Sequence, residues 1–126
     1  MKNHVTVGWF EIPVIDMERA MSFYEVIFEC KLERHQMGPI DMAWFPWNHE
    51  IGGAGGSLVK NEEYYQPSER GALVYFSSLD VNQELERIPN AGGKVLQSKT
   101  LISDEIGYMA LFLDTEGNRI ALHSLK

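Results

Sequence analysis

Few side chains in this sequence could hold a metal ion or attack a substrate, and they are scattered along the chain. There is one cysteine, Cys30, so neither an internal disulfide nor a cysteine metal cluster can form within the chain. Three of the four histidines, His4, His35 and His49, fall near an end or in polar stretches and are expected on the surface. His123, by contrast, belongs to a predicted strand.

A glycine-rich run, residues 51–59, is the one stretch that resembles a phosphate-binding loop. No lysine follows it at the required spacing and no helix follows it, so a nucleotide-binding loop is not expected. Glycine weakens an interior strand unless a bulge, a tight bend or a closely approaching backbone requires it. The run therefore predicts a glycine-rich strand or hairpin that closes the first half of the chain.

The composition is that of a single soluble domain. The chain has 126 residues, 44% of them hydrophobic and 23% charged, which is enough to bury a core. A net charge of −7 argues against a nucleic-acid backbone or an anionic membrane as partner. No apolar run approaches membrane-spanning length and residues 1–4 lack a signal-peptide core, so we expect a cytoplasmic protein.

The first half predicts a strand, a helix and three further strands. Residues 5–14 are rich in β-branched and aromatic side chains, and Asp16 can cap the helix that follows. That helix, residues 17–29, has apolar positions at helical spacing: Ala20, Phe23, Tyr24, Ile27 and Phe28. Residues 31–36 and 40–47 read as the next two strands, and the glycine-rich run completes the set. A polar, aromatic linker follows at about 61–71.

The second half repeats this order. Residues 73–79 predict a strand, and Asp80 with Gln83 three residues later resembles a capping box. The next helix carries an apolar stripe and is expected to end at Pro89 and the small residues 91–93. Strands are predicted at 94–98, 108–113 and 120–125, with a hairpin turn at 114–117.

Two sequence echoes support an internal duplication. Asp80 lies 64 residues after Asp16, and the run 109–112 echoes 42–45 at an offset of 67. The predicted fold class is therefore α+β, with two βαβββ modules forming a curved mixed sheet around a cleft. We expect one domain, 1–126, with the first module at about 1–60 and the second at about 72–126.

Three motifs resemble the vicinal oxygen chelate superfamily, which includes glyoxalase I, the bleomycin-resistance proteins and the extradiol dioxygenases. With the repeat, they span nearly the whole chain. They are Glu-Ile-Pro-Val-Ile-Asp-Met-Glu-Arg-Ala at 11–20 with Phe23-Tyr24, Ala91-Gly92-Gly93, and Asp-Thr-Glu-Gly-Asn-Arg-Ile at 114–120. The last is close to the family's Asp-Pro-Asp/Glu-Gly-Asn pattern.

The resemblance implies where a metal would bind. Active members usually hold a divalent metal through His or Glu side chains on four strands. Those positions fall here on Trp9, Val74 and Ala121 and near Gly56, and none of these side chains can ligate a metal. We therefore predict no metal ligands and no cofactor. The same count argues against glyoxalase I chemistry, which needs the metal to polarise vicinal oxygens.

Strand periodicity then predicts what lines the cleft, because residues two apart share a face. If the implied positions face the cleft, so do their neighbours two residues away. The cleft would be mostly apolar and aromatic, with one acid and one imidazole, which is typical of a small-molecule pocket. Its predicted ligand-binding residues are Trp9, Trp44, Val74, Phe76 and Ala121, with Trp47 as an alternative to Trp44.

Glu11 and His123 are the candidate catalytic residues of this cleft. Glu11 could act as a general base, alone or as an acid–base pair with His123. The alternative is that Glu11 orients a ligand or pairs with an arginine, while His123 is a satisfied residue of the last strand. A divalent metal would bind only if these two formed a shifted site, which lacks a certain third ligand.

Three functions are compatible with these features. The first is a metal-independent small-molecule-binding protein similar to the bleomycin-resistance type, for which the acidic charge and aromatic pocket favour a cationic, planar ligand. The second is a divergent lyase, isomerase or dioxygenase-type enzyme that uses Glu11 and His123. The third is a regulatory module or subunit without its own ligand. The resemblance also implies a homodimer.

Overall fold

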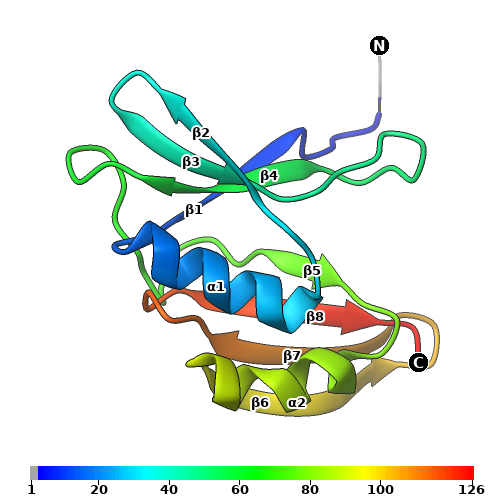
Figure 1. Cartoon of the computed structure of the whole chain (residues 1–126). Helices are drawn as coiled ribbons and strands as arrows, with labels where there is room; N and C mark the ends of the chain where they lie inside the picture. The colour runs from blue at the N-terminus through cyan, green and yellow to red at the C-terminus, as the bar shows by residue number, and fades with distance from the viewer. Residues whose placement is uncertain (1–2) are drawn as a thin grey trace.

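The computed structural model describes residues 3–126, and its two halves share one order of elements (Figure 1). The first half contains β1 (Trp9–Pro13), α1 (Met17–Phe28), β2 (Glu33–Met37), β3 (Ile40–Trp44) and β4 (Gly55–Lys60). The second contains β5 (Tyr75–Ser77), α2 (Val81–Ala91), β6 (Lys94–Ser103), β7 (Gly107–Leu113) and β8 (Arg119–Ser124). The predicted α+β fold with two βαβββ modules is confirmed.

Each module forms its own four-stranded mixed sheet. Sheet A has the order β1-β4-β3-β2 and sheet B has the order β5-β8-β7-β6. The first strand of each module pairs in parallel with the last, and the other pairs are antiparallel. Figure 1 shows α1 between the two sheets and α2 along sheet B. One face of sheet A is thereby covered by α1, whereas the opposite face carries no helix.

Both helices begin at the predicted aspartates. The Asp16 carboxylate accepts a hydrogen bond from Arg19 N at 3.0 Å, and that of Asp80 accepts one from Asn82 N at 3.0 Å. The reciprocal bond predicted for Gln83 is absent, because Asp80 N donates to Ser78 Oγ instead.

The small residues 91–93 end α2 as expected, whereas Pro89 does not. The helix passes through Pro89 and ends at Ala91. Pro89 lies in the last turn, so only one intrahelical bond is lost there. Gly92, with φ at 105°, then closes the helix by donating its N–H to the carbonyls of Ile88 and Pro89.

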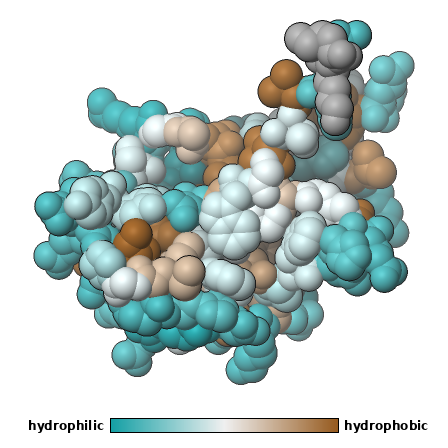
Figure 2. All heavy atoms as spheres, turned by 90° about the horizontal axis from the view of Figure 1, so that it is seen from above, coloured by the Kyte–Doolittle hydropathy of each residue, from teal (hydrophilic) through white to brown (hydrophobic). Residues whose placement is uncertain are grey.

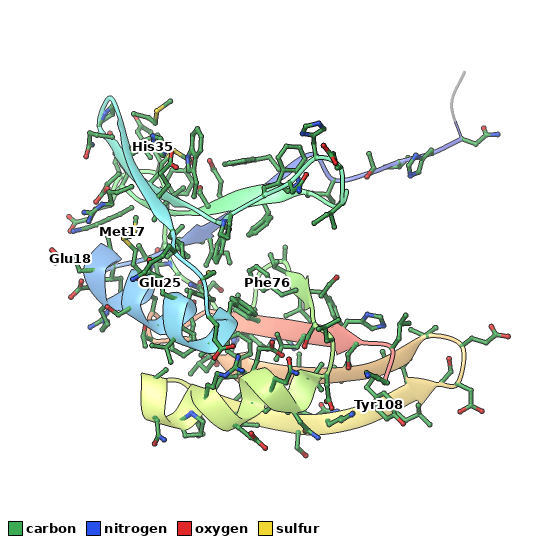
Figure 3. All side chains as sticks on the ribbon, turned by 45° about the vertical axis from the view of Figure 1, so that its right-hand side comes forward. Met17, Glu18, Glu25, His35, Phe76 and Tyr108 are labelled. Carbon is green, nitrogen blue, oxygen red and sulfur yellow. The ribbon has the colours of Figure 1, made fainter. Side chains whose placement is uncertain are left out.

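An aromatic core joins the two sheets. Phe76 on β5 lies 4.8 Å from Phe28 and 5.5 Å from Phe10, measured between ring centroids. Tyr24 on α1 lies 5.5 Å from Phe45 in an edge-to-face arrangement. Figure 3 shows Phe76 in the space between the sheets beside α1. The core-facing side of each sheet is thus defined by these rings.

The turn between β7 and β8 binds the first module. Asp114 accepts a hydrogen bond from the buried Tyr24 hydroxyl at 2.6 Å. Glu116 Oε1 accepts from the backbone N–H groups of Ile15 and Asp16, both at 2.8 Å, and the carboxylate pairs with Arg19. These contacts connect residues about a hundred positions apart, so the two modules are fixed to each other at this corner.

The glycine-rich run divides into a loop and a strand. Residues 55–60 form β4, and Gly56 on its core-facing side lies directly against the ring of Phe10. A Cβ atom at Gly56 would overlap that ring. Residue 56 must therefore be a glycine, because the Phe10 ring lies so close to the backbone there.

Across residues 3–126, no helix combines the length and apolar character needed to cross a membrane.

Candidate functional site

The uncovered side of sheet A, which we call the outer face, brings together most of the aromatic side chains that the sequence singled out. Trp9 and Glu11 on β1 lie on it, because Phe10 and Ile12 between them face the core. The register of the sheet then adds Ser57 and Trp44. Figure 2 looks onto this side of the molecule, where pale and brown side chains fill the middle and teal ones lie around the rim.

A pocket of about 430 Å³ opens at the end of sheet A where β1 and β2 begin and β3 ends. It contains all three tryptophans of the chain. A glutamate and a lysine stand at its edge. The lining residues are Trp9, Lys31, Glu33, Trp44, Phe45, Pro46 and Trp47. The pocket is mainly apolar, with charge only at its rim.

The indole rings are arranged around a glycine. A Cβ atom at Gly55 would lie 3.3 Å from Trp9 Cζ3 and 3.4 Å from Trp47 Cγ, so the two rings flank the bare backbone there. Trp9 meets Trp44 edge-on, with 5.8 Å between ring centroids. The Trp47 indole N–H donates to the Gly53 carbonyl at 3.2 Å. Trp9 and Trp47 remain 45% and 55% exposed, so their faces are available to a ligand.

His35 supports the far side of Trp44. Its ring lies 4.0 Å from that of Trp44 between centroids, and its Nε2 lies 2.7 Å from Glu33 Oε1. A carboxylate only accepts, so Nε2 carries the hydrogen of this bond. Figure 3 places His35 on sheet A. The sequence assigned His35 to the surface; the structure assigns it a packing role beneath the pocket.

Glu11 lies on the outer face and is held by the linker between the modules. The Tyr65 hydroxyl donates to Glu11 Oε1 at 2.8 Å. This hydrogen bond, with a smaller contribution from burial, raises the pKa of the Tyr65 hydroxyl. The carboxylate is therefore oriented by a neutral donor and retains Oε2 for another partner.

Ala121 and His123 lie on sheet B, on the side away from α2. His123 Nε2 lies 2.6 Å from the carbonyl oxygen of Ile106, so Nε2 carries the hydrogen and Nδ1 is the ring's possible acceptor. Among the described residues, no hydrogen bond or ion pair connects His123 with Glu11. Within one chain, the two candidate catalytic residues have separate partners on separate sheets.

Strand phase separates Phe76 from Ala121 and His123. Phe76 pairs with Leu122, one residue away from both Ala121 and His123, and therefore faces the core. Val74 lies just before β5, where its carbonyl accepts from Ala121 N at 2.9 Å. The parity argument placed Phe76 with Ala121, but the structure puts these two side chains on opposite sides of sheet B.

The side chains present do not fit the metal that the resemblance would imply. Trp9, Val74 and Ala121 offer no donor atom, and β4 presents Ser57 to the outer face rather than Gly56. Within residues 3–126, no three His, Cys, Asp or Glu side chains gather closely enough to hold a metal ion. The chemistry available in this chain is therefore that of an aromatic pocket beside a carboxylate.

Ser57 is the residue of this face that sequence reasoning missed. The fourth-strand position was placed near Gly56, and a shift of one residue reverses which side chain faces outward. Residues 55–59, Gly-Gly-Ser-Leu-Val, show no alternation of polar and apolar side chains, so without the register the phase of this strand was undetermined.

Comparison with known sequences gives a consistent assignment. A family model described as Glyoxalase/Bleomycin resistance protein/Dioxygenase superfamily matches residues 3–122. A glyoxylase-like domain-containing protein from Didymella fabae is 30% identical over 125 residues, which cover 97% of this chain and 95% of the relative.

Solved structures share the fold. A mutant of glyoxalase I from Zea mays superposes with a TM-score of 0.73 at 23% identity over 94% of this chain. This chain spans about half of the maize enzyme, 45% of its length. TnmS3, an antibiotic-binding protein from a Streptomyces species, superposes with a TM-score of 0.65 at 24% identity and covers 98% of both chains.

Proposed function

This chain belongs to the Glyoxalase/Bleomycin resistance protein/Dioxygenase superfamily, and from that premise we propose that it binds a planar, neutral or cationic small molecule without the family's usual metal. The observation that carries the proposal is the convergence of all three tryptophans on one pocket of about 430 Å³. An indole stands at the position where active relatives are expected to carry a metal ligand. A fold neighbour of nearly equal length is an antibiotic-binding protein.

The pocket suits binding through ring faces. Indole rings provide large apolar surfaces at low conformational cost, and they attract cations through their negative ring faces. Trp9 and Trp47 lie close over the backbone of Gly55, and both border the pocket in which a flat ring system would bind. Glu33 at the rim and Glu11 further along the same face outnumber the one lysine of the rim, Lys31, which gives this surface a negative bias that favours a cation.

The proposal is tested by calorimetric titration with proflavine, a planar tricyclic cation, and resorufin, a planar tricyclic anion of similar size. We expect proflavine to bind with at least micromolar affinity and resorufin to bind much more weakly. Trp9→Ala should weaken proflavine binding about fivefold, since one lost aromatic contact removes on the order of 1 kcal/mol.

Tyr64→Ala supplies the matched control, because Tyr64 is an exposed aromatic residue outside the pocket. It should bind proflavine as the wild type does. If no planar compound binds, or if Trp9→Ala and Tyr64→Ala behave alike, the pocket is not the binding site. Analysis of the titrated mixtures for new products checks that binding occurs without turnover.

A homodimer is the second part of the proposal. Apolar side chains remain exposed on both sheets: Tyr75 on β5 is 50% exposed and Ile106, in the turn between β6 and β7, is 53% exposed, in addition to the tryptophans of sheet A. Such surfaces usually mark contacts with another molecule.

The alternative function, an enzyme using Glu11 and His123, needs these residues in one site. That alternative therefore depends on a second copy bringing the two outer faces together.

A further inference from the structure

One row of paired residues crosses the outer face of sheet A beside the aromatic pocket. Glu11 on β1 pairs with Ser57 on β4, Ser57 pairs with Trp44 on β3, and Trp44 pairs with Glu33 on β2. Paired residues on one face have Cβ atoms about 4.5–5.5 Å apart. The two inner members, Ser57 and Trp44, are therefore within reach of a single small group.

Both inner members carry a buried polar atom without a partner. Ser57 is fully buried, and its hydroxyl makes no hydrogen bond within the described chain. The indole Nε1 of Trp44 is likewise buried and unpaired. Buried polar atoms are nearly always paired, and leaving them unpaired costs free energy. Trp44 lines the aromatic pocket, whereas Ser57 lies on the neighbouring strand and is not part of the pocket lining. We take these two atoms as the floor of a candidate subsite next to the pocket.

The chemistry of the two atoms defines what they would bind. The Trp44 Nε1–H can only donate, and the Ser57 hydroxyl can donate to the same atom. The complementary group is a hydrogen-bond acceptor, such as a carbonyl oxygen or a ring nitrogen. A carboxylate is disfavoured because the row ends in Glu11 and Glu33. We propose that the ligand stacked on the tryptophans carries a neutral acceptor atom that receives hydrogen bonds from Ser57 Oγ and Trp44 Nε1.

Access to the floor runs past Trp9. This indole is 45% exposed, contacts Trp44 edge-on, and rests on the bare backbone of Gly55 rather than on a side chain. We therefore expect that the Trp9 ring can rotate to admit a ligand group to the row while the strands stay in place. Since this inference rests on the proposed aromatic site, its test must separate the acceptor from the stacking.

The test compares 9-fluorenone with fluorene, two planar tricyclic probes that differ by the ketone oxygen. Binding of each is measured by quenching of tryptophan fluorescence, corrected for absorption by the probe. We expect the wild type to prefer fluorenone by roughly tenfold, since one paired acceptor satisfies two buried donors. In Ser57→Ala and in Trp44→Phe, the ratio of the two affinities should fall to about twofold or less.

Ser98→Ala is the matched control, because Ser98 is an exposed serine on β6 of the other sheet. It should keep the wild-type ratio. Ser57→Ala also has a readout without ligand: removal of an unpaired buried hydroxyl should leave the melting temperature unchanged or raise it. A clear fall in melting temperature would show that the hydroxyl is paired in the free protein and would overturn the inference.

The possible outcomes separate the two proposals. If both probes bind with equal affinity, the aromatic site stands and the acceptor subsite is wrong. If neither probe binds, nor proflavine, the aromatic site itself is wrong. If fluorenone is preferred but the preference survives both Ser57→Ala and Trp44→Phe, the acceptor is recognised elsewhere and this inference is overturned.

Discussion

Glu116 is the side chain that most directly connects the two modules. Its carboxylate is fully buried and accepts hydrogen bonds from two backbone N–H groups, from Arg19 and from the Thr115 hydroxyl. Burial alone would raise the pKa of Glu116. The hydrogen bonds, chiefly those of Arg19 and Asp16 N, outweigh burial and lower this pKa from 4.5 to about 2.

This pKa shift predicts how stability depends on pH. A carboxyl group with a depressed folded-state pKa stabilises the protein above its unfolded pKa, and this contribution is lost as pH falls through the folded pKa. The free energy of unfolding should therefore decrease between about pH 4.5 and pH 2, by about 3 kcal/mol for this group. Denaturant titrations across this range measure the effect.

Glu116→Gln should remove that part of the pH dependence and lower the free energy of unfolding at pH 7 by about 2–3 kcal/mol, because a charge-assisted buried network is lost. Glu86→Gln, on the exposed side of α2, should leave both quantities as in the wild type. Identical pH profiles for the two variants would show that Glu116 does not carry the effect.

The sequence could predict which site residues share a face of the sheet only when they lie on the same strand. Trp9 and Glu11 share a face because they lie two apart on one strand, and the structure places both on the outer face of sheet A. Phe76 could not be related to Ala121 in this way, because the phase of two separate strands depends on their register. One residue of difference places Phe76 opposite Leu122 and turns its ring into the core.

At the scale of elements, β4 shows why a glycine-rich run can form a central strand. Gly56 allows the ring of Phe10 to lie against the backbone on the core side. Gly55 makes the same allowance for Trp9 and Trp47 at the pocket. The bare backbone of these two glycines therefore gives the aromatic side chains of neighbouring segments a surface to pack against.

Gly56→Ala should destabilise the protein by about 1–3 kcal/mol or more, because the added methyl group overlaps the Phe10 ring and the strands cannot separate to accommodate it. Gly71→Ala is the control: it has open space around its Cβ position, so its effect should be small or slightly stabilising. The melting temperatures of both variants, measured by thermal unfolding, test this prediction. Equal melting temperatures would refute the packing role assigned to Gly56.

The elements themselves were largely predictable from the sequence. Caps, apolar stripes and the turn at 114–117 are local signals, and the two helices start after Asp16 and Asp80 as predicted. The predicted and observed elements differ mainly at the ends of strands, where tertiary contacts determine how far the strand continues. Strand β6 continues to Ser103, five residues beyond its predicted end, because it pairs with β7 through several register shifts.

At the scale of the molecule, the uncovered faces of sheets A and B predict self-association. Sedimentation equilibrium should give twice the chain mass of 14.4 kDa at micromolar concentrations. Ile106→Glu places a charge in the turn between β6 and β7, whose carbonyl at residue 106 contacts His123, and should shift the equilibrium towards the monomer at least tenfold. A monomeric wild type at all concentrations would exclude the dimer.

Val26→Glu is the matched control for that variant. Val26 is an apolar residue of α1 with similar exposure, 50%, but it lies on neither uncovered sheet face. It should leave the association constant unchanged. If both variants weaken association equally, the contact surface is not the one proposed.

The corner built by residues 114–118 also has a consequence for the order in which the protein matures on the ribosome. The start of α1 receives its hydrogen-bond acceptor from a glutamate that is translated about a hundred residues later. Until that turn emerges, the amides of Ile15 and Asp16 lack their native partner and the hydroxyl of Tyr24 lacks its carboxylate. We therefore expect the first module, although translated first, to complete its native structure only after residues 114–118 have emerged.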